Sequence, residues 1–349
     1  MSISTNETPI VAIAQKRSFE INGHFAERHA PLARRLDDYG VGAVALNGAV
    51  DHAGDGIFAR HYTFDADDRN LTLSDSPIRV DSALDITGGI ARYTPEVAAL
   101  NPLGVREIAL SKQLQFEALR GELGDAIPMT VIASASSEAV NAAIDSLQTD
   151  QIILKAEGDY EKAHRMLVGS KDEVRPLIGH LLKDMNPNED KVLAQEFMPE
   201  AKEPFATGIR YFDDNEAAID QARSGTSREL RVHVIDDTPI LVTGRAGLDA
   251  AQKSPRDEWI YLDGDSVPSH VYDLASEAAR LIRLRADAID SYLAVDMTPD
   301  GRRIVEVNGR NIGTMRSEVG RPGSLVAHEI TTDAVARKLV VMAHNKRGA

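Results

Sequence analysis

Cysteine is absent from the 349 residues of the sequence. Its absence excludes disulfides, thiolate metal sites and a cysteine nucleophile. Long apolar runs are absent too, since none approaches the roughly 20 residues that a bilayer-spanning helix needs. The polar start, Met1 to Pro9, has neither the basic residues nor the apolar core of a signal peptide. We therefore expect no membrane partner and a cytoplasmic location.

Positive charge is scarce, because 39 Lys and Arg residues stand against 54 Asp and Glu residues, a formal net charge of −15. This balance disfavours nucleic acid as a partner, since sequence-independent binding to it depends on excess positive charge. Small molecules are the expected partners instead. For a polyanionic ligand such as a nucleotide, local cations must overcome the field of the whole molecule, so the Lys and Arg residues near a site are the informative ones.

The chain is longer than one hydrophobic core usually serves, which predicts two or three packed subdomains. Near the N-terminus, the apolar runs Pro9 to Ala14 and Val41 to Leu46 flank an amphipathic stretch from His24 to Tyr39 that Gly40 ends. This β-α-β pattern predicts an α/β domain with a partly parallel sheet, followed by loops and short strands from His52 to Ser82.

A short helix is predicted from Pro95 to Leu100, and Asn101 to Gly104 interrupts it before a second helix, Ser111 to Leu123. We interpret the interruption as a linker and as the first domain boundary. The predicted domains are an N-terminal α/β domain (residues 1–104), a central subdomain (residues 105–192) and a C-terminal subdomain (residues 193–349).

The remaining chain is expected to alternate strands with helices and then to form two hairpins. Glu157 to His164 is expected to be a loop, and Phe205 to Ser227 to be polar and irregular. The predicted strands are Pro128 to Ala133, Gln151 to Lys155, Arg165 to Val168 and Val192 to Phe197; the predicted helices are Ser134 to Leu147 and Val271 to Leu284; the predicted hairpins are Leu230 to Ile235 with Ile240 to Thr243, and Tyr292 to Met297 with Arg303 to Val307.

The last hairpin carries the strongest chemical signal. Glu306 and Asn308, two residues apart on one strand, project to the same face, and Asp296 on the paired strand can join them. Two carboxylates and an amide oxygen form an all-oxygen ligand set that suits Mg²⁺ shared with phosphates. A solvated hairpin explains the three residues equally well when they are taken alone.

Several other residues suit a nucleotide site, although each also has an ordinary explanation. Lys155 ends an apolar strand, where a cation can reach phosphate, and Lys112 lies in the first turn of its helix. Solvated lysines at such positions are the common case. The segment Gln195-Glu196-Phe197-Met198 offers backbone groups and apolar walls for an adenine ring, and it equally fits a core strand that enters a turn.

Charged residues also alternate along one strand of the first predicted hairpin. Glu229, Arg231 and His233 share a face there, and Arg245 at the end of the paired strand can join them. On that face a carboxylate can accept hydrogen bonds from ribose hydroxyls, and Arg231 can bind an anion. The alternative is a cross-strand salt bridge, which is worth little when exposed.

In this order along the chain, Lys112, Lys155, the Gln195 to Met198 segment, Glu229-Leu230-Arg231, Arg245, Asp296 and Glu306-Val307-Asn308 resemble the ATP-grasp superfamily. The likeness covers the chain after the linker, and it is greatest for glutathione synthetase and the glutamate ligases that modify a ribosomal protein. The fold that the resemblance implies is an ATP-grasp fold, α/β with an α+β C-terminal part, preceded by an N-terminal α/β domain.

The resemblance implies ATP and Mg²⁺ as cofactors and a role for each residue. Lys112 and Lys155 would contact the phosphates, Glu196 to Met198 would form the adenine hinge, and Glu229 would hold ribose. Asp296, Glu306 and Asn308 would bind Mg²⁺, while Arg231, Arg245 and Arg310 would orient the substrate carboxylate and the transferred phosphate. Two departures stand out: Ala156 to His164 is poorer in glycine than the family's phosphate-covering loop, and the long Pro204 to Ser227 segment leaves Glu200 and Glu203 as rival ribose ligands.

The reaction implied is the ATP-dependent joining of a small-molecule carboxylate to an amine through an acyl phosphate, with ADP and phosphate as products. Amino acids or short peptides are the expected substrates. Another ATP-grasp reaction, such as carboxylation or thioester formation, and a non-catalytic nucleotide-binding or scaffold protein are the alternatives. A homodimer is our expectation for the assembly.

Overall fold

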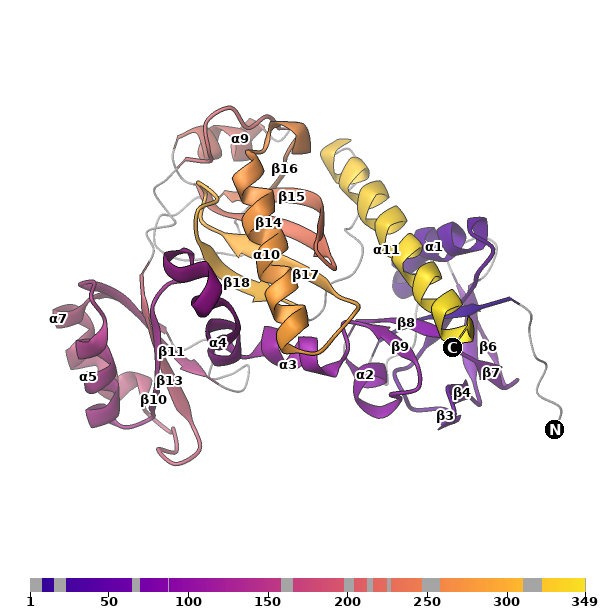
Figure 1. Ribbon diagram of the computed structural model, residues 1–349, viewed down its shortest axis with the longest axis horizontal. Helices are drawn as coiled ribbons and strands as arrows, with labels where there is room; N and C mark the ends of the chain where they lie inside the picture. Colours follow the sequence, from indigo (N-terminus) through magenta and orange to yellow (C-terminus); the bar gives the residue numbers. More distant parts are fainter. Residues whose placement is uncertain are drawn as a thin grey trace.

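The structure is a computed structural model that describes residues 8–15, 23–64, 70–86, 88–157, 166–197, 204–211, 216–224, 227–246, 258–309 and 322–348. These residues form sheets of six, four and five strands and a small sheet of three. In Figure 1 the four-stranded sheet lies at the left, the five-stranded sheet in the middle and the six-stranded sheet at the right.

The N-terminal sheet has the strand order β6-β5-β2-β1-β8-β9, in which β2, β1, β8 and β9 run parallel. Its strands are β1 (Ile10–Ala14), β2 (Gly42–Leu46), β5 (His61–Phe64), β6 (Leu71–Ser74), β8 (Ser82–Asp85) and β9 (Ala98–Leu100). Helix α1 (Gly23–Asp38) connects β1 to β2, so the predicted β-α-β start is confirmed. The short strands β3 (His52–Gly54), β4 (Ile57–Phe58) and β7 (Ile78–Arg79) pair with one another.

The predicted helix from Pro95 to Leu100 is wrong. Helix α2 (Gly89–Tyr93) ends before it, and β9 pairs in parallel with β8 instead. Alanine and leucine are strong helix formers. In this chain, however, Ala99 and Leu100 are buried in two separate hydrophobic clusters on the two faces of the sheet, so the tertiary context overrides the local preference.

After the break at Asn101, α3 (Leu103–Leu110) and α4 (Lys112–Leu123) lead to a sheet with the order β10-β13-β11-β12, whose neighbouring strands are all antiparallel. This central sheet contains β10 (Thr130–Ser134), β11 (Gln151–Glu157), β12 (Met166–Ser170) and β13 (Lys191–Glu196), with helices α5 (Ser137–Ser146), α7 (Lys171–Val174) and α8 (Ile178–Leu181). The four predicted strands and the helix between the first two are confirmed. The predicted loop lies, apart from Glu157, outside the described residues.

The C-terminal sheet has the order β16-β15-β14-β17-β18, again with antiparallel neighbours. Its strands are β14 (Ser227–Ile235), β15 (Thr238–Ala246), β16 (Glu258–Tyr261), β17 (Tyr292–Met297) and β18 (Ile304–Asn308), so both predicted hairpins are confirmed. Helix α10 (Ser269–Arg285), also predicted, covers one face, where its Ala279 and Ile282 share a buried cluster with Val232 and Val295.

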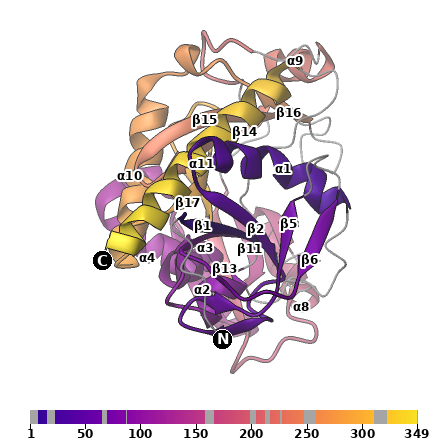
Figure 2. The same cartoon turned by 90° about the vertical axis from the view of Figure 1, so that its right-hand side faces the viewer.

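Other helices also differ from the sequence-based expectation. Helix α3 begins at Leu103, inside the segment Asn101 to Gly104 that was interpreted as a linker, and no helix was predicted there. The segment Phe205 to Ser227 contains α9 (Glu216–Arg223), so its assignment as irregular is wrong for those eight residues. No element was predicted for α11 (Pro322–Gly348), which runs from the five-stranded sheet to the N-terminal sheet and lies beside α1 (Figures 1 and 2). Its Val335 and Leu339 are buried with residues of β1 and α1.

The division into three domains stays a prediction. Strand β13 crosses its second boundary, between residues 192 and 193, and α11 from the third unit packs on the first. Within the described parts of the chain, no helix combines the length and the apolar character that crossing a bilayer requires.

Candidate active site

One face of the C-terminal sheet is polar and carries most of the residues singled out in the sequence. On β14, Val232 and Val234 are buried in the cluster that includes α10, so the alternation of the strand turns Glu229, Arg231 and His233 to the opposite face. Residues that pair directly across strands share a face. We define the polar face by these residues together with Thr243 and Arg245 of β15, Trp259 of β16, Asp296 of β17, and Glu306 and Asn308 of β18.

At the centre of the polar face, Arg231 and Asp296 form a two-pronged ion pair. They are direct partners across β14 and β17, and Arg231 Nε and Nη2 donate to the two Asp296 carboxylate oxygens at 2.6 and 2.7 Å. Asp296 is only 1% exposed. Burial alone would lower the pKa of Arg231, but the charge and hydrogen bonds of Asp296 outweigh it and raise that pKa. Arg231 is therefore a permanent cation.

The three predicted metal ligands lie together beside this pair. Glu306 pairs directly with Asp296 across β17 and β18, next to a register shift that sets the local geometry. Asn308 Nδ2 donates to Asp296 Oδ2 at 3.0 Å, and Lys112 Nζ lies 2.9 Å from Glu306 Oε2. Two carboxylates and an amide from adjacent strands are hence matched by two cations, one from β14 and one from α4.

This donor set fits Mg²⁺ in its chemistry, because carboxylate and amide oxygens are hard ligands. Among the described residues, no three His, Cys, Asp or Glu side chains lie together as a metal-binding group. Asn308 would therefore have to complete the set with Asp296 and Glu306. Both carboxylates already face a cation, Asp296 facing Arg231 and Glu306 facing Lys112.

Glu229 and Arg245 form a second cross-strand pair on the polar face. The shortest distance between their charged atoms is 3.5 Å, with Glu229 fully buried and the Arg245 side chain 18% exposed. Trp259, directly opposite Arg245 on β16, places its indole ring against both arginines. The salt bridge considered for these residues is thus formed, and the ribose contact of Glu229 stays a prediction.

The central sheet contributes Lys155 and the end of β13. Ile152, Leu154 and Ala194 are buried in the cluster of that sheet, so Lys155 and Gln195 project from the other face. The Gln195 amide donates to Thr130 Oγ1 at 2.9 Å.

Glu196 and Phe197, which follow Gln195, are the first residues of the predicted adenine hinge. Glu196 Oε2 accepts a hydrogen bond from the Met129 amide at 3.1 Å, and the Phe197 amide donates to the Gln151 carbonyl at 3.0 Å. Met198, the rival ribose ligands Glu200 and Glu203, and Arg310 lie outside the described residues.

A small cavity lies where α4 meets the central sheet and the C-terminal sheet. Its lining includes Thr130 and Gln195 of the central sheet, Lys112 and Gln115 of α4, and Glu306 of β18. Its volume is about 20 Å³, which is far below what a nucleotide occupies. Three predicted site residues, Lys112, Gln195 and Glu306, nevertheless meet around it.

Sequence reasoning missed three residues of this region. Trp259 was overlooked, although its being the only tryptophan is a visible signal. Gln115 and Thr243 are buried polar side chains, and only the packing of α4 and the strand register identify their surroundings.

Comparison with protein-family models found no match, and comparison with curated protein sequences found none. Solved structures match nearly the whole chain. The macrocyclase MdnC from Microcystis aeruginosa MRC, bound with precursor peptide MdnA, is 16% identical, with a TM-score of 0.54 over 95% of this chain and 99% of that one. The ATP-grasp ligase PsnB, complexed with a minimal precursor, Mg and ADP, is 15% identical, with a TM-score of 0.53 over 98% and 100%.

D-alanine–D-alanine ligase from Bacillus anthracis, complexed with ATP, is 13% identical, with a TM-score of 0.55 over 98% of this chain and 99% of that one. The chain has the ATP-grasp fold. The ATP-grasp fold expected from the order of residues is thereby confirmed. The roles of the individual residues stay predictions.

Proposed function

We propose that the chain is an ATP-dependent ligase that joins a carboxylate to an amine and releases ADP and phosphate. The observation that carries the proposal is the meeting of Asp296, Glu306 and Asn308 with Arg231 and Lys112. Burying such charges costs desolvation energy, and a hairpin needs none of them to form. The ATP-grasp fold that this chain shares with an ATP-bound ligase and an ADP- and Mg-bound ligase supports the proposal.

Asp296, Glu306 and Asn308 would hold Mg²⁺. When bound, the ion would neutralise charge on the nucleotide phosphates. Lys112 and Lys155 would contact the same phosphates from α4 and β11. The backbone of Glu196 to Met198 would bind adenine, with Gln195 before it and Glu229 as the candidate ribose ligand.

The reaction would proceed in two balanced steps. A carboxylate oxygen of the substrate forms a bond to the γ-phosphorus of ATP while the bond to ADP breaks, which gives an acyl phosphate. The amine nitrogen then bonds to the acyl carbon, phosphate leaves, and the nitrogen loses a proton. Arg231, Arg245 and Arg310 would orient the carboxylate and stabilise charge on the transferred group, so that positioning and electrostatics replace a protein nucleophile.

Amino acids or short peptides are the proposed substrates. Arginines beside the metal ligands suit a carboxylate-bearing molecule. The MdnC structure contains a precursor peptide and the PsnB structure contains a minimal precursor, which supports the peptide alternative for this fold.

Screening pairs of amino acids and short peptides for product formation tests the proposal. We expect ADP and phosphate to appear only when ATP, Mg²⁺, a carboxylate and an amine are all present. AMP and pyrophosphate as products would contradict it. ADP release with bicarbonate or a thiol in place of the amine would assign a different ATP-grasp reaction, and bound but uncleaved ATP would assign a non-catalytic role.

A further inference from the structure

The only tryptophan of the chain, Trp259, lies against both arginines of the polar face. Arg231 Cζ is 4.7 Å and Arg245 Cζ is 5.6 Å from the centroid of its indole rings. Both distances fall within the roughly 6 Å over which a cation is attracted to an aromatic face. We propose that Trp259 is a positioning residue that holds the two guanidinium groups ready for the anionic groups of the reactants. This inference rests on the proposed function.

The strand register explains how one ring reaches two arginines. Trp259 is the direct partner of Arg245 across β16 and β15, and Arg231 lies on the next strand, β14, opposite Thr243. Because the side chains all project from the same face, the half-buried indole can extend from the edge strand over its neighbours.

Burial distinguishes Asp296 and Glu229 from the arginines with which they pair. Asp296 and Glu229 are 1% and 0% exposed, whereas the side chains of their partners Arg231 and Arg245 are 26% and 18% exposed. In these two pairs the carboxylate lies deeper and the guanidinium group lies nearer to solvent, whereas Glu306 is 30% exposed and faces Lys112. At Arg231 and Arg245 an approaching anion therefore meets positive charge first, although the chain as a whole carries a net charge of −15.

Two neighbouring arginines need such a support because their charges repel and their side chains are long and flexible. The two hydrogen bonds from Arg231 to Asp296 fix one edge of its guanidinium group. The indole supplies a flat surface against which both groups rest. It also displaces water, which strengthens the attraction between the arginines and an anion. Groups that are fixed before the anion arrives lose less entropy when it binds.

A second observation points to a ligand-binding role for this surface. Thr243 is fully buried and lies directly opposite Arg231 in the strand register, and its hydroxyl makes no hydrogen bond to any described residue. Native structures rarely leave a buried hydroxyl without a partner. A polar ligand on the polar face would supply one.

The test uses ADP and inorganic phosphate, two products of the proposed reaction, together with Mg²⁺, as probes with the full chain. Calorimetry measures the binding of Mg²⁺ and ADP, and then of phosphate to the loaded enzyme, for wild type, Trp259→Leu, Trp259→Phe and Tyr39→Leu. Tyr39 is a matched control, because its ring contacts Arg337 at 6.0 Å outside the polar face. Indole fluorescence of the wild type provides a second readout, since all of it comes from Trp259.

We expect Trp259→Leu to bind phosphate about tenfold more weakly, which corresponds to about 1.4 kcal/mol. Trp259→Phe keeps an aromatic face and should stay within about twofold of wild type, as should Tyr39→Leu. ADP with Mg²⁺ should bind equally to all four proteins, and phosphate should change the wild-type indole emission.

Wild-type phosphate affinity in Trp259→Leu, or an equal loss in the Leu and Phe variants, would overturn the inference while leaving the proposed function intact. If wild type binds no ADP in the presence of Mg²⁺, the proposed function fails, and the role of Trp259 fails with it.

Discussion

The side-chain amide of Gln115 pairs with both backbone polar groups of Val307. Gln115 Nε2 donates to the Val307 carbonyl at 2.9 Å, and Gln115 Oε1 accepts from the Val307 amide at 3.0 Å. Val307 lies on the edge strand β18, between Glu306 and Asn308. Gln115 of α4 thus makes the backbone hydrogen bonds that a further strand would make at this edge of the sheet. It does so at the point where two predicted metal ligands project.

We expect Gln115→Leu to lower the free energy of unfolding by about 3 kcal/mol, because a buried backbone group left without a partner costs about 1–3 kcal/mol. The amide also donates to the Ala109 carbonyl at 2.8 Å, so three backbone groups lose their partner. Chemical denaturation measures the change. Gln113→Leu is the control, since Gln113 is exposed on the same helix and should change stability by less than about 0.5 kcal/mol. Equal effects in both variants would contradict this role of Gln115.

Asp296 is the residue on which the proposed chemistry depends most. Asp296→Asn keeps the shape of the side chain but removes the charge that faces Arg231 and would face Mg²⁺. Following the proposed function, we expect ADP formation to fall by about 100-fold and the Mg²⁺ requirement to rise, as for the loss of a metal ligand. A titration of the rate against Mg²⁺ concentration measures both effects. Asp273→Asn, on the exposed side of α10, should leave both unchanged. Wild-type behaviour of Asp296→Asn would rule out the metal site.

Part of this site could be predicted from local spacing. Glu306 and Asn308 are two residues apart, so any strand containing them turns both to one face. Arg231 and Asp296 are 65 residues apart in sequence, and no local pattern determines the register that pairs their strands. The stacking of Trp259 depends in the same way on where β16 joins the sheet.

Helix α11 was missed for a different physical reason. Its first half places Ala327 against Leu241 and Tyr261 of the C-terminal sheet, while its second half buries Val335 and Leu339 against the N-terminal sheet. A helix that packs on different elements along its length has no single apolar stripe. Its sequence therefore lacks the periodicity from which the amphipathic α1 and α10 were predicted.

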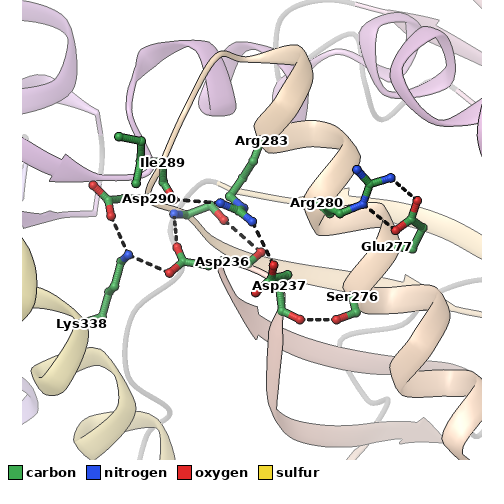
Figure 3. Close-up of polar contacts among 10 residues, drawn as sticks. Asp236, Asp237, Ser276, Glu277, Arg280, Arg283, Ile289, Asp290 and Lys338 are labelled. Carbon is green, nitrogen blue, oxygen red and sulfur yellow. Dashed lines mark hydrogen bonds and ion pairs between the residues drawn. The ribbon is translucent and has the colours of Figure 1, made fainter.

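Lys338 fixes α11 to the C-terminal sheet through two carboxylates (Figure 3). Its Nζ lies 2.7 Å from Asp236 and 2.5 Å from Asp290. Burial lowers the pKa of Lys338, but hydrogen bonds to these two acids outweigh it, and the net shift is upward. A raised pKa means that this stabilisation is complete at neutral pH and is lost only as the pH rises through the folded-state value.

We expect Lys338→Met to lower the free energy of unfolding by about 2 kcal/mol at neutral pH, because it leaves two partly buried carboxylates without their cation. Urea denaturation measures the change. Lys346→Met, an exposed position in the last turns of the same helix, is the matched control and should have little effect. A Lys338→Met protein as stable as the control would show that the ion pairs do not secure α11.

His233, on the polar face, makes the free energy of unfolding depend on pH. Its ring is buried, with Nδ1 3.1 Å from Tyr292 Oη, and burial together with the charge of Arg231 lowers its pKa to about 3. In the unfolded chain the pKa returns to about 6.5. As the pH falls below that value, the unfolded state binds a proton that the folded state does not bind. The free energy of unfolding therefore decreases progressively until the pH reaches the folded-state pKa.

Between about pH 7.5 and pH 5, this single group should cost the wild type about 2 kcal/mol of unfolding free energy. Urea denaturation at the two pH values measures that loss. In His233→Leu the loss should be smaller by the same amount, because the variant has no imidazole to protonate. The substitution also removes the hydrogen bond to Tyr292 Oη. Because this loss is the same at both pH values, it cancels when the two unfolding free energies are subtracted. If wild type and variant lose the same stability, His233 must be able to accept a proton within the folded protein, and its burial beside Arg231 would not control the pH response.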